Sequence, residues 1–264
     1  MKRHHIQVNK HPSASKPSRG ALLFVHGAYT HSSYWEFNFI PFFQGHGFDC
    51  FSVDLSGHGA SAGRERLDEF GIDDYADDIA HAVNAIGRPV TIVGHSMGCL
   101  ATQRYLEKGQ ARAAVFLAPV PSTGTAGSAM QLALRYPRYF DVLEEVVSGV
   151  FSEENNDLMA KIYFSPDATG DDVQEFLPTV GPESRQAVME MAMLATRPRV
   201  GRQKLPVLVI GGEDDAIFPP SHLFFTALPW QAEVIRVPNA GHMLPIDTHW
   251  QRVATHILEW VVRE

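Results

Sequence analysis

Ser96 lies in the pentapeptide GHSMG at residues 94–98, between two stretches of different character. Residues 90–93 form a β-branched apolar run typical of a short buried strand, and residues 101–107 have helical composition. The two flanking glycines permit a strand-to-helix turn so tight that side chains at their positions would collide with neighbouring backbone. Such a turn exposes the serine hydroxyl, while the helix N-terminus aims N–H groups at any anion that forms nearby. The pattern therefore predicts a nucleophile beside an oxyanion-binding site.

A serine hydroxyl is a weak nucleophile near neutral pH, so it requires a base within hydrogen-bond reach and an acid that orients this base. His242 is the best candidate base because it follows the last predicted strand, Gly241 permits a turn before it, and imidazole titrates near neutral pH. Three other histidines lie near strand ends. His95 is adjacent to the serine in a turn that directs neighbours apart, and His26 and His58 are expected to serve their own loops.

Asp214 and Asp215, in the segment GGEDDAIFPP, are the candidate acids, since the loop after residues 113–117 contains no acidic residue. An early carboxylate in such a turn often caps the following helix, so one of the pair is a candidate for a structural role. A second oxyanion donor is expected at the His-Gly turn that follows the first apolar strand. The backbone N–H of Ala28 is the candidate donor there, and Tyr29 is the alternative.

The elements that must position these residues alternate between strands and helices. Strands are predicted at 21–25, 48–55, 90–93, 113–117, 206–210 and 234–237, of which the apolar runs at 21–25, 90–93 and 113–117 are expected to be buried. Helices are predicted at 34–45, 72–86 and 248–262. This alternation predicts an α/β fold with a mostly parallel central sheet flanked by helices. In such sheets ligands bind at the carboxyl ends of the strands, where the serine, the aspartate pair and His242 are all expected.

The chain of 264 residues fits one domain with an insertion. We expect an N-terminal lead-in at 1–20, a core formed by 21–119 and 205–264, and an inserted helical cap at 120–204. The cap contains five methionines, which we expect mostly to fill its own core, although flexible thioethers also suit an adaptable substrate pocket. They are Met130, Met159, Met189, Met191 and Met193. The aspartates at 73, 74, 77 and 78 are expected on the solvated face of the helix at 72–86, near its N-terminus.

The composition argues against several classes of function. The charge of 22 basic and 30 acidic residues is −8 without a basic block, so nucleic acid is not an expected partner. We expect no membrane span and, without a secretory signal, a cytoplasmic location. Cys50 and Cys99 are expected to be small core residues, and the scattered His4, His5 and His11 do not predict a metal site. We therefore expect no metal and no cofactor, and the sequence does not predict an oligomeric state.

The segment GHGASA at residues 57–62 formally fits a dinucleotide-binding fingerprint. The charged stretch RERLDEF follows where that fingerprint requires a helix packed on its third small residue. We therefore favour a glycine loop near the mouth of the site over an oxidoreductase that uses NAD.

Five segments occur in the order of recurring blocks of the α/β-hydrolase superfamily, which the chain resembles from about residue 20 to 262. They are HGAYTHSSYW, DLSGHGAS, GHSMG, GGEDDAIFP and AGHMLP. The residues from DLSGHGAS through DDYADDI are similar to the monoacylglycerol lipase and lysophospholipase branch. The resemblance implies that Ser96 is the nucleophile and His242 the base, and that the N–H groups of Ala28 and Met97 form the oxyanion hole. It also implies that Asp215 is the acid, at the family's spacing from the preceding glycine and the following proline.

These residues predict a serine hydrolase that cleaves a carboxylic ester or thioester through an acyl-enzyme, on a small-molecule substrate with an apolar acyl group. Relatives that cleave carbon–carbon bonds or form peracids use the same three side chains, and a non-catalytic ligand receptor can keep the same fold. These remain the alternative hypotheses.

Overall fold

The computed structural model describes residues 4–174, 176–193 and 204–264. The strands are β1 (Val8–His11), β2 (Gly20–Val25), β3 (Phe48–Val53), β4 (Val90–His95), β5 (Ala113–Leu117), β6 (Val207–Gly212) and β7 (Glu233–Val237). They form one sheet in the order β1-β3-β2-β4-β5-β6-β7. Strand β1 pairs antiparallel with β3, and the other neighbouring strands pair in parallel. The predicted α/β fold with a mostly parallel sheet is confirmed.

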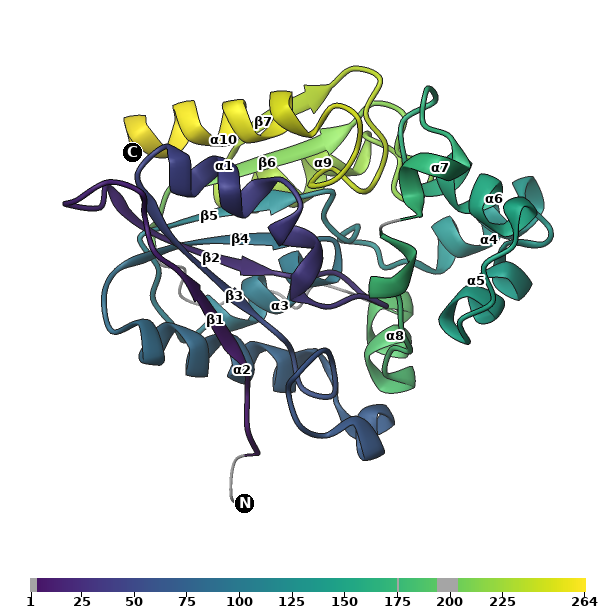
Figure 1. Cartoon of the computed structure of the whole chain (residues 1–264), viewed down its shortest axis with the longest axis horizontal. Coiled ribbons are helices and arrows are strands. Elements are labelled where there is room, and N and C mark those ends of the chain that lie inside the picture. Colours follow the sequence, from purple (N-terminus) through teal and green to yellow (C-terminus); the bar gives the residue numbers. More distant parts are fainter. Residues whose placement is uncertain (1–3, 175, 194–203) are drawn as a thin grey trace.

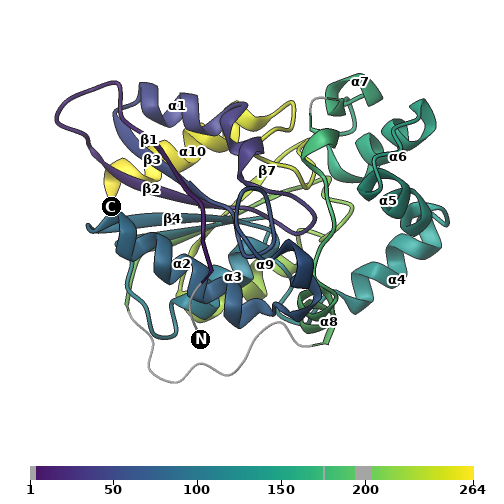
Figure 2. The same cartoon turned by 60° about the horizontal axis from the view of Figure 1, so that its bottom comes forward.

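Helices cover both faces of this sheet (Figure 1). Helices α2 (Ile72–Ile86) and α3 (Met97–Tyr105) lie on one face, and α1 (Phe39–Gly45) and α10 (Trp250–Arg263) lie on the other, as Figure 2 shows. The predicted helix at 72–86 is confirmed with its bounds. The helix predicted at 34–45 is instead divided into a 3₁₀ turn, Ser32–Glu36, and the shorter α1.

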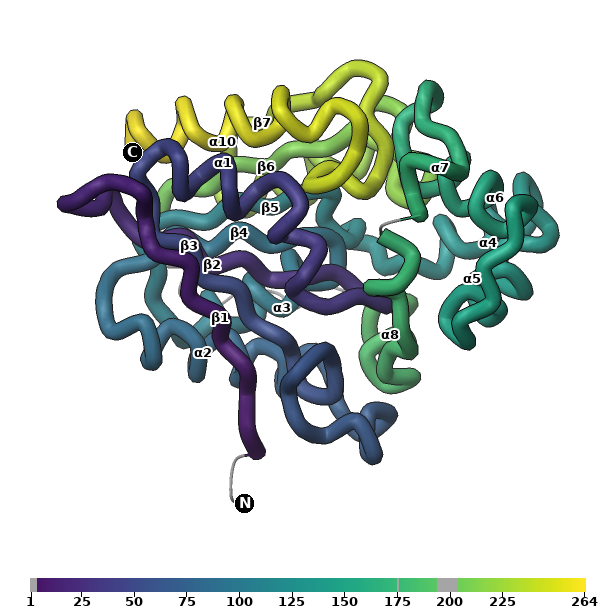
Figure 3. The backbone as a smooth tube through the Cα atoms, viewed as in Figure 1, coloured from purple at the N-terminus to yellow at the C-terminus, as the bar shows by residue number. Residues whose placement is uncertain are grey.

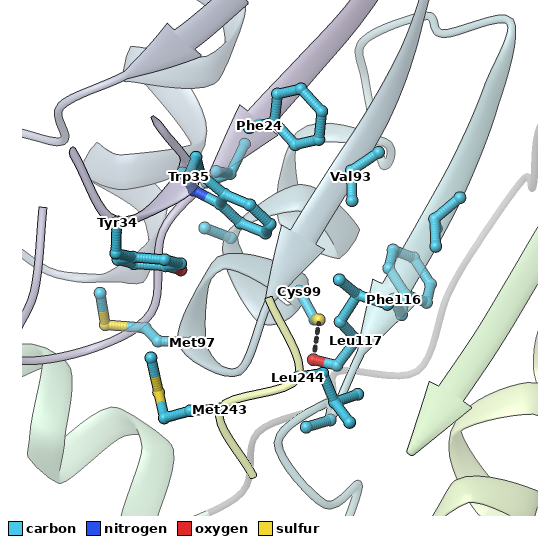
Figure 4. Packing of buried hydrophobic residues seen from close by; sticks show 14 of the residues in the cluster. Phe24, Tyr34, Trp35, Val93, Met97, Cys99, Phe116, Leu117, Met243 and Leu244 are labelled. Carbon is cyan, nitrogen blue, oxygen red and sulfur yellow. Dashed lines mark hydrogen bonds between the residues drawn. The ribbon is translucent and has the colours of Figure 1, made fainter. Parts of the chain in front are cut away.

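The central strands are apolar because helices bury them on both faces. Every residue of β4, β5 and β6 is buried. Figure 4 shows part of this core, in which the Cys99 thiol points at the carbonyl oxygen of Leu117, 3.3 Å away. Both Cys50 and Cys99 are free and buried, and burial raises the pKa of both thiols. The cysteines are therefore core residues, as the sequence predicts, and they stay protonated at neutral pH.

The N-terminal segment contributes an edge strand that the sequence did not predict. Strand β1 pairs residue by residue with β3, from Val8 opposite Val53 to His11 opposite Cys50. Its residues are polar or only half-buried, so no apolar run marks the strand. Its position is stabilised by backbone pairing with β3, which does not require an apolar sequence.

Between β5 and β6 the chain forms a group of helices beyond the carboxyl ends of the parallel strands (Figure 1 and Figure 3). They are α4 (Ala126–Arg135), α5 (Tyr139–Val147), α6 (Glu153–Tyr163), α7 (Gly170–Val173) and α8 (Arg185–Met193). We call these helices and their connections the cap segment. Residues 175 and 194–203, which the predicted cap includes, lie outside the described residues. In the described ranges no helix is both long and apolar enough to cross a bilayer.

Two expectations about burial are wrong. Met159 and Met191 are buried, but Met130, Met189 and Met193 are 68%, 62% and 72% exposed, so most of the five methionines do not fill a core. A helical pattern indicates which residues share a face, but not how much of that face a neighbouring element covers.

The second error concerns Asp78, which is buried, whereas Asp73, Asp74 and Asp77 are exposed as expected. The Asp78 carboxylate accepts a hydrogen bond of 2.7 Å from the backbone N–H of Ser56. This partner lies 22 positions earlier in the chain, and the local sequence of α2 gives no indication of it.

Candidate active site

Ser96 lies at the apex of the turn between β4 and α3, with φ 50° and ψ −115°. A positive φ is strained for a residue with a side chain, and such strain is concentrated at functional sites. A Cβ atom at Gly98 would lie 2.5 Å from the carbonyl oxygens of Val25 and His26, and one at Gly94 would lie 2.8 Å from the carbonyl oxygen of Gly98. The prediction that both glycines are required by close backbone contacts is confirmed.

The structure brings Ser96, His242 and Asp215 into one hydrogen-bonded chain. His242 Nε2 lies 3.1 Å from the Ser96 hydroxyl, and His242 Nδ1 lies 2.8 Å from Asp215 Oδ2. The other oxygen of Asp215 accepts the N–H groups of Ile217 and Phe218, both at 2.8 Å. These bonds fix the carboxylate so that it orients the imidazole with Nε2 toward the serine.

The two candidate acids occupy different environments. Asp215 is buried in the loop that follows β6, three residues after its last residue, Gly212. Asp214 is exposed, and its backbone N–H donates to the carbonyl of Ala240. Only Asp215 contacts His242. Asp215 therefore meets the geometric requirement for an acid that orients the base, and Asp214 does not.

His95 connects the His242 loop to the turn after β2. Its Nε2 donates to the carbonyl oxygen of His242 at 3.0 Å, and its Nδ1 accepts from the Tyr34 hydroxyl at 3.1 Å. The Tyr34 oxygen in turn accepts the N–H of Gly27 at 3.2 Å. Burial, with a smaller effect of His242, lowers the pKa of His95 to about 3, so the ring is neutral and has one donor and one acceptor. His95 therefore holds the two turns in register without competing as a base.

Asp247 provides a second support for the His242 loop. Its Oδ2 accepts the N–H of Gly241 at 3.1 Å and the N–H of Ser165, in the cap segment, at 2.7 Å. The carboxyl side chain is completely buried. It thereby ties the turn that carries His242 to the cap segment. Asp247 was not among the residues predicted for the site, although it lies five residues after His242 in the segment AGHMLPID.

The N–H groups expected to bind an oxyanion lie on either side of Ser96. A Cβ at Gly27 would lie 3.2 Å from Ser96 Cβ, so the Gly27–Ala28 turn faces the serine directly. Among the described residues no group accepts the N–H of Ala28. Met97 is the first residue of α3, where an N–H has no acceptor within the helix. Both donors are therefore available to a substrate oxygen.

Tyr29, the alternative donor, has its backbone N–H occupied. This N–H donates to Oε2 of Glu183 at 3.3 Å, and the Tyr29 carbonyl accepts the N–H of Gly181 at 2.8 Å. The Tyr29 side chain lines the cavity described below. Glu183 and Gly181 both belong to the cap segment, so this segment fixes the backbone directly after Ala28.

Glu183 is the centre of a buried polar cluster. Its Oε1 accepts the Tyr75 hydroxyl and the N–H of Ser184, both at 2.7 Å, and its Oε2 lies 3.2 Å from His58 Nε2. Burial disfavours the charged carboxylate, but the charge of His58 and the hydrogen bonds outweigh this effect and lower the pKa of Glu183. For His58, burial is likewise outweighed by Glu183, which raises the histidine pKa. No local pattern in the sequence indicates the role of Glu183, because its partners Tyr29 and Tyr75 lie 154 and 108 positions away in the chain.

The glycine loop at residues 57–62 does not form the mouth of the site. None of its residues lines the cavity beside Ser96. The loop is instead held by the Asp54 carboxylate, which accepts the N–H of Ala60 in the loop and the N–H of Ser32, both at 2.9 Å. His58 of this loop contacts Glu183, so the loop affects the site indirectly without lining the cavity.

A cavity of about 160 Å³ opens beside Ser96 and His242, between the sheet edge and the cap segment. Its apolar lining includes side chains from several cap helices, among them Leu132, Leu143, Met159, Phe176 and Met191. Its described lining contains no Lys, Arg, Asp or Glu side chain. The polar groups that it presents are hydroxyls, the backbone of the Gly27–Ala28 turn, and the two histidines next to Ser96. No cluster of three side chains suited to a metal occurs among the described residues.

The fold and this site define a class of protein. The sequence matches the model of the alpha/beta hydrolase family over residues 22–256, and the chain belongs to this family. It is 26% identical over 246 residues to the N-formylmaleamate deformylase of Pseudomonas putida. The aligned residues cover 86% of this chain and 83% of that protein.

Solved structures show the same fold. A monoacylglycerol lipase of Paleococcus ferrophilus has a TM-score of 0.70 at 22% identity, covering 98% of this chain and 99% of that one. A thermophilic esterase of Thermogutta terrifontis has a TM-score of 0.72 at 19% identity, covering 98% and 93%. At these identities the likeness establishes the fold alone.

Proposed function

We propose that this protein is a serine hydrolase that cleaves carboxylic esters or thioesters of small molecules. The observation that carries the proposal is the chain of hydrogen bonds from Asp215 through His242 to Ser96, at the wall of an apolar cavity. Membership of the alpha/beta hydrolase family and the esterase and lipase among its structural neighbours support it. The deformylase among its relatives supports acyl transfer to water in general, without favouring esters.

In the proposed mechanism His242 Nε2 takes the Ser96 proton as the serine oxygen attacks the acyl carbonyl. The N–H groups of Ala28 and Met97 bind the resulting oxyanion, and one such donor contributes about 2.7 to 4 kcal/mol. Asp215 holds the imidazole in its tautomer and stabilises the imidazolium. His242 then protonates the leaving group, and water, activated by the same histidine, hydrolyses the acyl-enzyme.

The proposal is tested by the hydrolysis of p-nitrophenyl esters and by covalent labelling with an alkyl fluorophosphonate. Ser96→Ala should abolish turnover and labelling, and mass spectrometry should locate the label on Ser96. Ser128→Ala is the matched control, because Ser128 lines the same cavity without contacting His242. Folded wild-type protein that neither hydrolyses an ester nor takes up the label, or that takes it up at another serine, would contradict the proposal.

A further inference from the structure

We propose that the cavity beside Ser96 selects an uncharged substrate group that carries a hydrogen-bond acceptor and is no larger than about one six-membered ring. The acceptor is bound by the hydroxyl pair of Tyr139 and Tyr163. This inference rests on the proposed function, since it names the substrates that Ser96 would attack. It narrows the expected apolar acyl substrates to two classes, both of which bear an ether or carbonyl oxygen. These are small aromatic acyl groups and acyl chains of about six carbons.

The hydrogen bonding of the two tyrosines leaves one proton without a partner. Tyr139 belongs to α5 and Tyr163 to α6, and both residues line the cavity. Their hydroxyl oxygens lie 2.6 Å apart. One hydroxyl donates to the other, so the proton of the accepting hydroxyl needs a different acceptor. Among the described residues no second partner is found for either hydroxyl. Because buried donors are normally paired, the remaining proton is suited to an acceptor on the substrate.

Both phenols are donors at neutral pH. Burial raises the pKa of Tyr139 to about 12, and burial together with the neighbouring Tyr139 raises the pKa of Tyr163 further above its ordinary value. The described lining holds no Lys or Arg that could pair with an anionic group. Of the two histidines in the lining, His95 is neutral because burial lowers its pKa to about 3, and His242 already faces the Asp215 carboxylate. Moving a carboxylate from water into such a site is unfavourable unless it is paired. The cavity therefore favours a neutral acceptor over a carboxylate.

The size of the cavity limits what it can enclose. A cavity of about 150 Å³ lined by aliphatic and aromatic side chains is large enough to bind benzene. The cavity beside Ser96 has a volume of about 160 Å³, and its lining is mostly aliphatic and aromatic but also includes hydroxyl side chains and two histidines. A palmitoyl chain is several times larger than this space, so most of it would lie outside and gain little from burial.

Equilibrium binding tests the inference without requiring turnover. We would titrate Ser96→Ala with anisole, ethylbenzene and benzoate, followed by NMR, because anisole and ethylbenzene differ by one ether oxygen at nearly constant shape. The preference for anisole over ethylbenzene should fall on the order of tenfold when Tyr139→Phe and Tyr163→Phe are added together. Benzoate should bind most weakly. Tyr136→Phe, a cap tyrosine outside the cavity lining, is the matched control and should keep the preference.

Kinetics tests the same inference on ester substrates. We would compare the p-nitrophenyl esters of hexanoate, its ether isosteres 4-methoxybutanoate, 3-ethoxypropanoate and propoxyacetate, and palmitate. At least one ether ester should have a higher kcat/KM than the hexanoate ester in the wild-type protein. The ratio of these two kcat/KM values should fall on the order of tenfold in the double phenylalanine variant. Comparing the ratio between variants cancels the intrinsic reactivity of each ester.

The results separate the two proposals. An unchanged anisole preference in the double variant, tighter binding of benzoate, or fastest hydrolysis of palmitate would overturn the inference about the cavity while leaving an ester hydrolase intact. An absence of hydrolysis and labelling in folded wild-type protein would overturn the proposed function. The binding titration would then still decide whether the tyrosine pair recognises a neutral acceptor.

Discussion

Glu183→Gln provides a sharp test of whether the cap segment positions the proposed oxyanion hole. Three hydrogen-bond donors converge on the Glu183 carboxylate: the Tyr75 hydroxyl and the N–H groups of Ser184 and Tyr29. His58 Nε2 forms an ion-pair contact with Oε2 at 3.2 Å. Glutamine has nearly the same shape but only one acceptor oxygen. That oxygen can accept from Tyr75 and Ser184, as Oε1 does now. The amide NH₂ would then face His58, which can lose its proton and accept, and Tyr29, which cannot.

The unpaired group is therefore the N–H of Tyr29. Leaving a buried donor without an acceptor costs about 1 to 3 kcal/mol, which the variant should lose in its free energy of unfolding. Tyr29 has φ 61°, so its conformation is strained and depends on the bonds that hold it. When this residue relaxes, the preceding N–H of Ala28 is displaced from the oxyanion position. A full oxyanion donor contributes about 2.7 to 4 kcal/mol, so a partial loss should lower kcat on the order of 10- to 100-fold.

The assay is steady-state hydrolysis of a short-chain ester, together with urea unfolding. We expect kcat to fall while KM changes by about twofold or less, because an oxyanion donor acts mainly in the transition state. Glu190→Gln is the matched control: Glu190 also joins the cap segment to the core, by accepting the N–H of Ile72 at 2.9 Å, but it does not contact the Ala28 turn. A Glu183→Gln variant that loses stability but keeps the wild-type kcat would refute the positioning role.

Three further predictions follow from the same structure. Gly98→Ala should destabilise the fold by about 1 to 3 kcal/mol in urea unfolding, because its Cβ would overlap the carbonyl oxygens of Val25 and His26, whereas Gly127→Ala, which has open space, should not destabilise it. Asp215→Asn should lower kcat far more than Asp214→Asn in ester hydrolysis, since only Asp215 contacts His242; equal losses would contradict this. Because the pKa of His58 is raised in the folded protein, protonation of His58 stabilises the fold. This stabilisation is complete below pH 6.5 and is lost as pH rises through the raised pKa. The lowered pKa of Glu183 makes its stabilisation present above pH 4.5 and lost on acidification. The destabilisation caused by His58→Gln should therefore be largest between pH 4.5 and 6.5 and should decrease as pH rises through the raised pKa of His58.

The sequence predicted the central sheet well because its signal is local. A parallel strand covered on both faces is a mostly apolar run, and the predicted strands coincide with β2 through β6 within a few residues. The edge strand β7 is also found where it is predicted, although most of its residues are exposed. The signal fails where an element is stabilised by backbone pairing instead of burial, as in the polar edge strand β1. It also fails for three of the five cap methionines, because the coverage of a helix face depends on neighbours that the periodicity does not describe.

For the site, local sequence predicted the groups that would react, but not the groups that hold them. Glycines mark the turns around Ser96, at the end of β6 and before His242. The positions of Ser96, Asp215 and His242 at the carboxyl ends of the strands follow from these turns and from the order of the strands in the sequence. Glu183 reaches Tyr29 across 154 positions of the chain, and Asp247 reaches Ser165 across 82. Both carboxylates join the cap segment to a turn beside Ser96. Since these bonds form only when the cap segment is docked, the geometry of the proposed oxyanion hole depends on cap docking, and substitutions in the cap segment far from Ser96 should change kcat as well as KM.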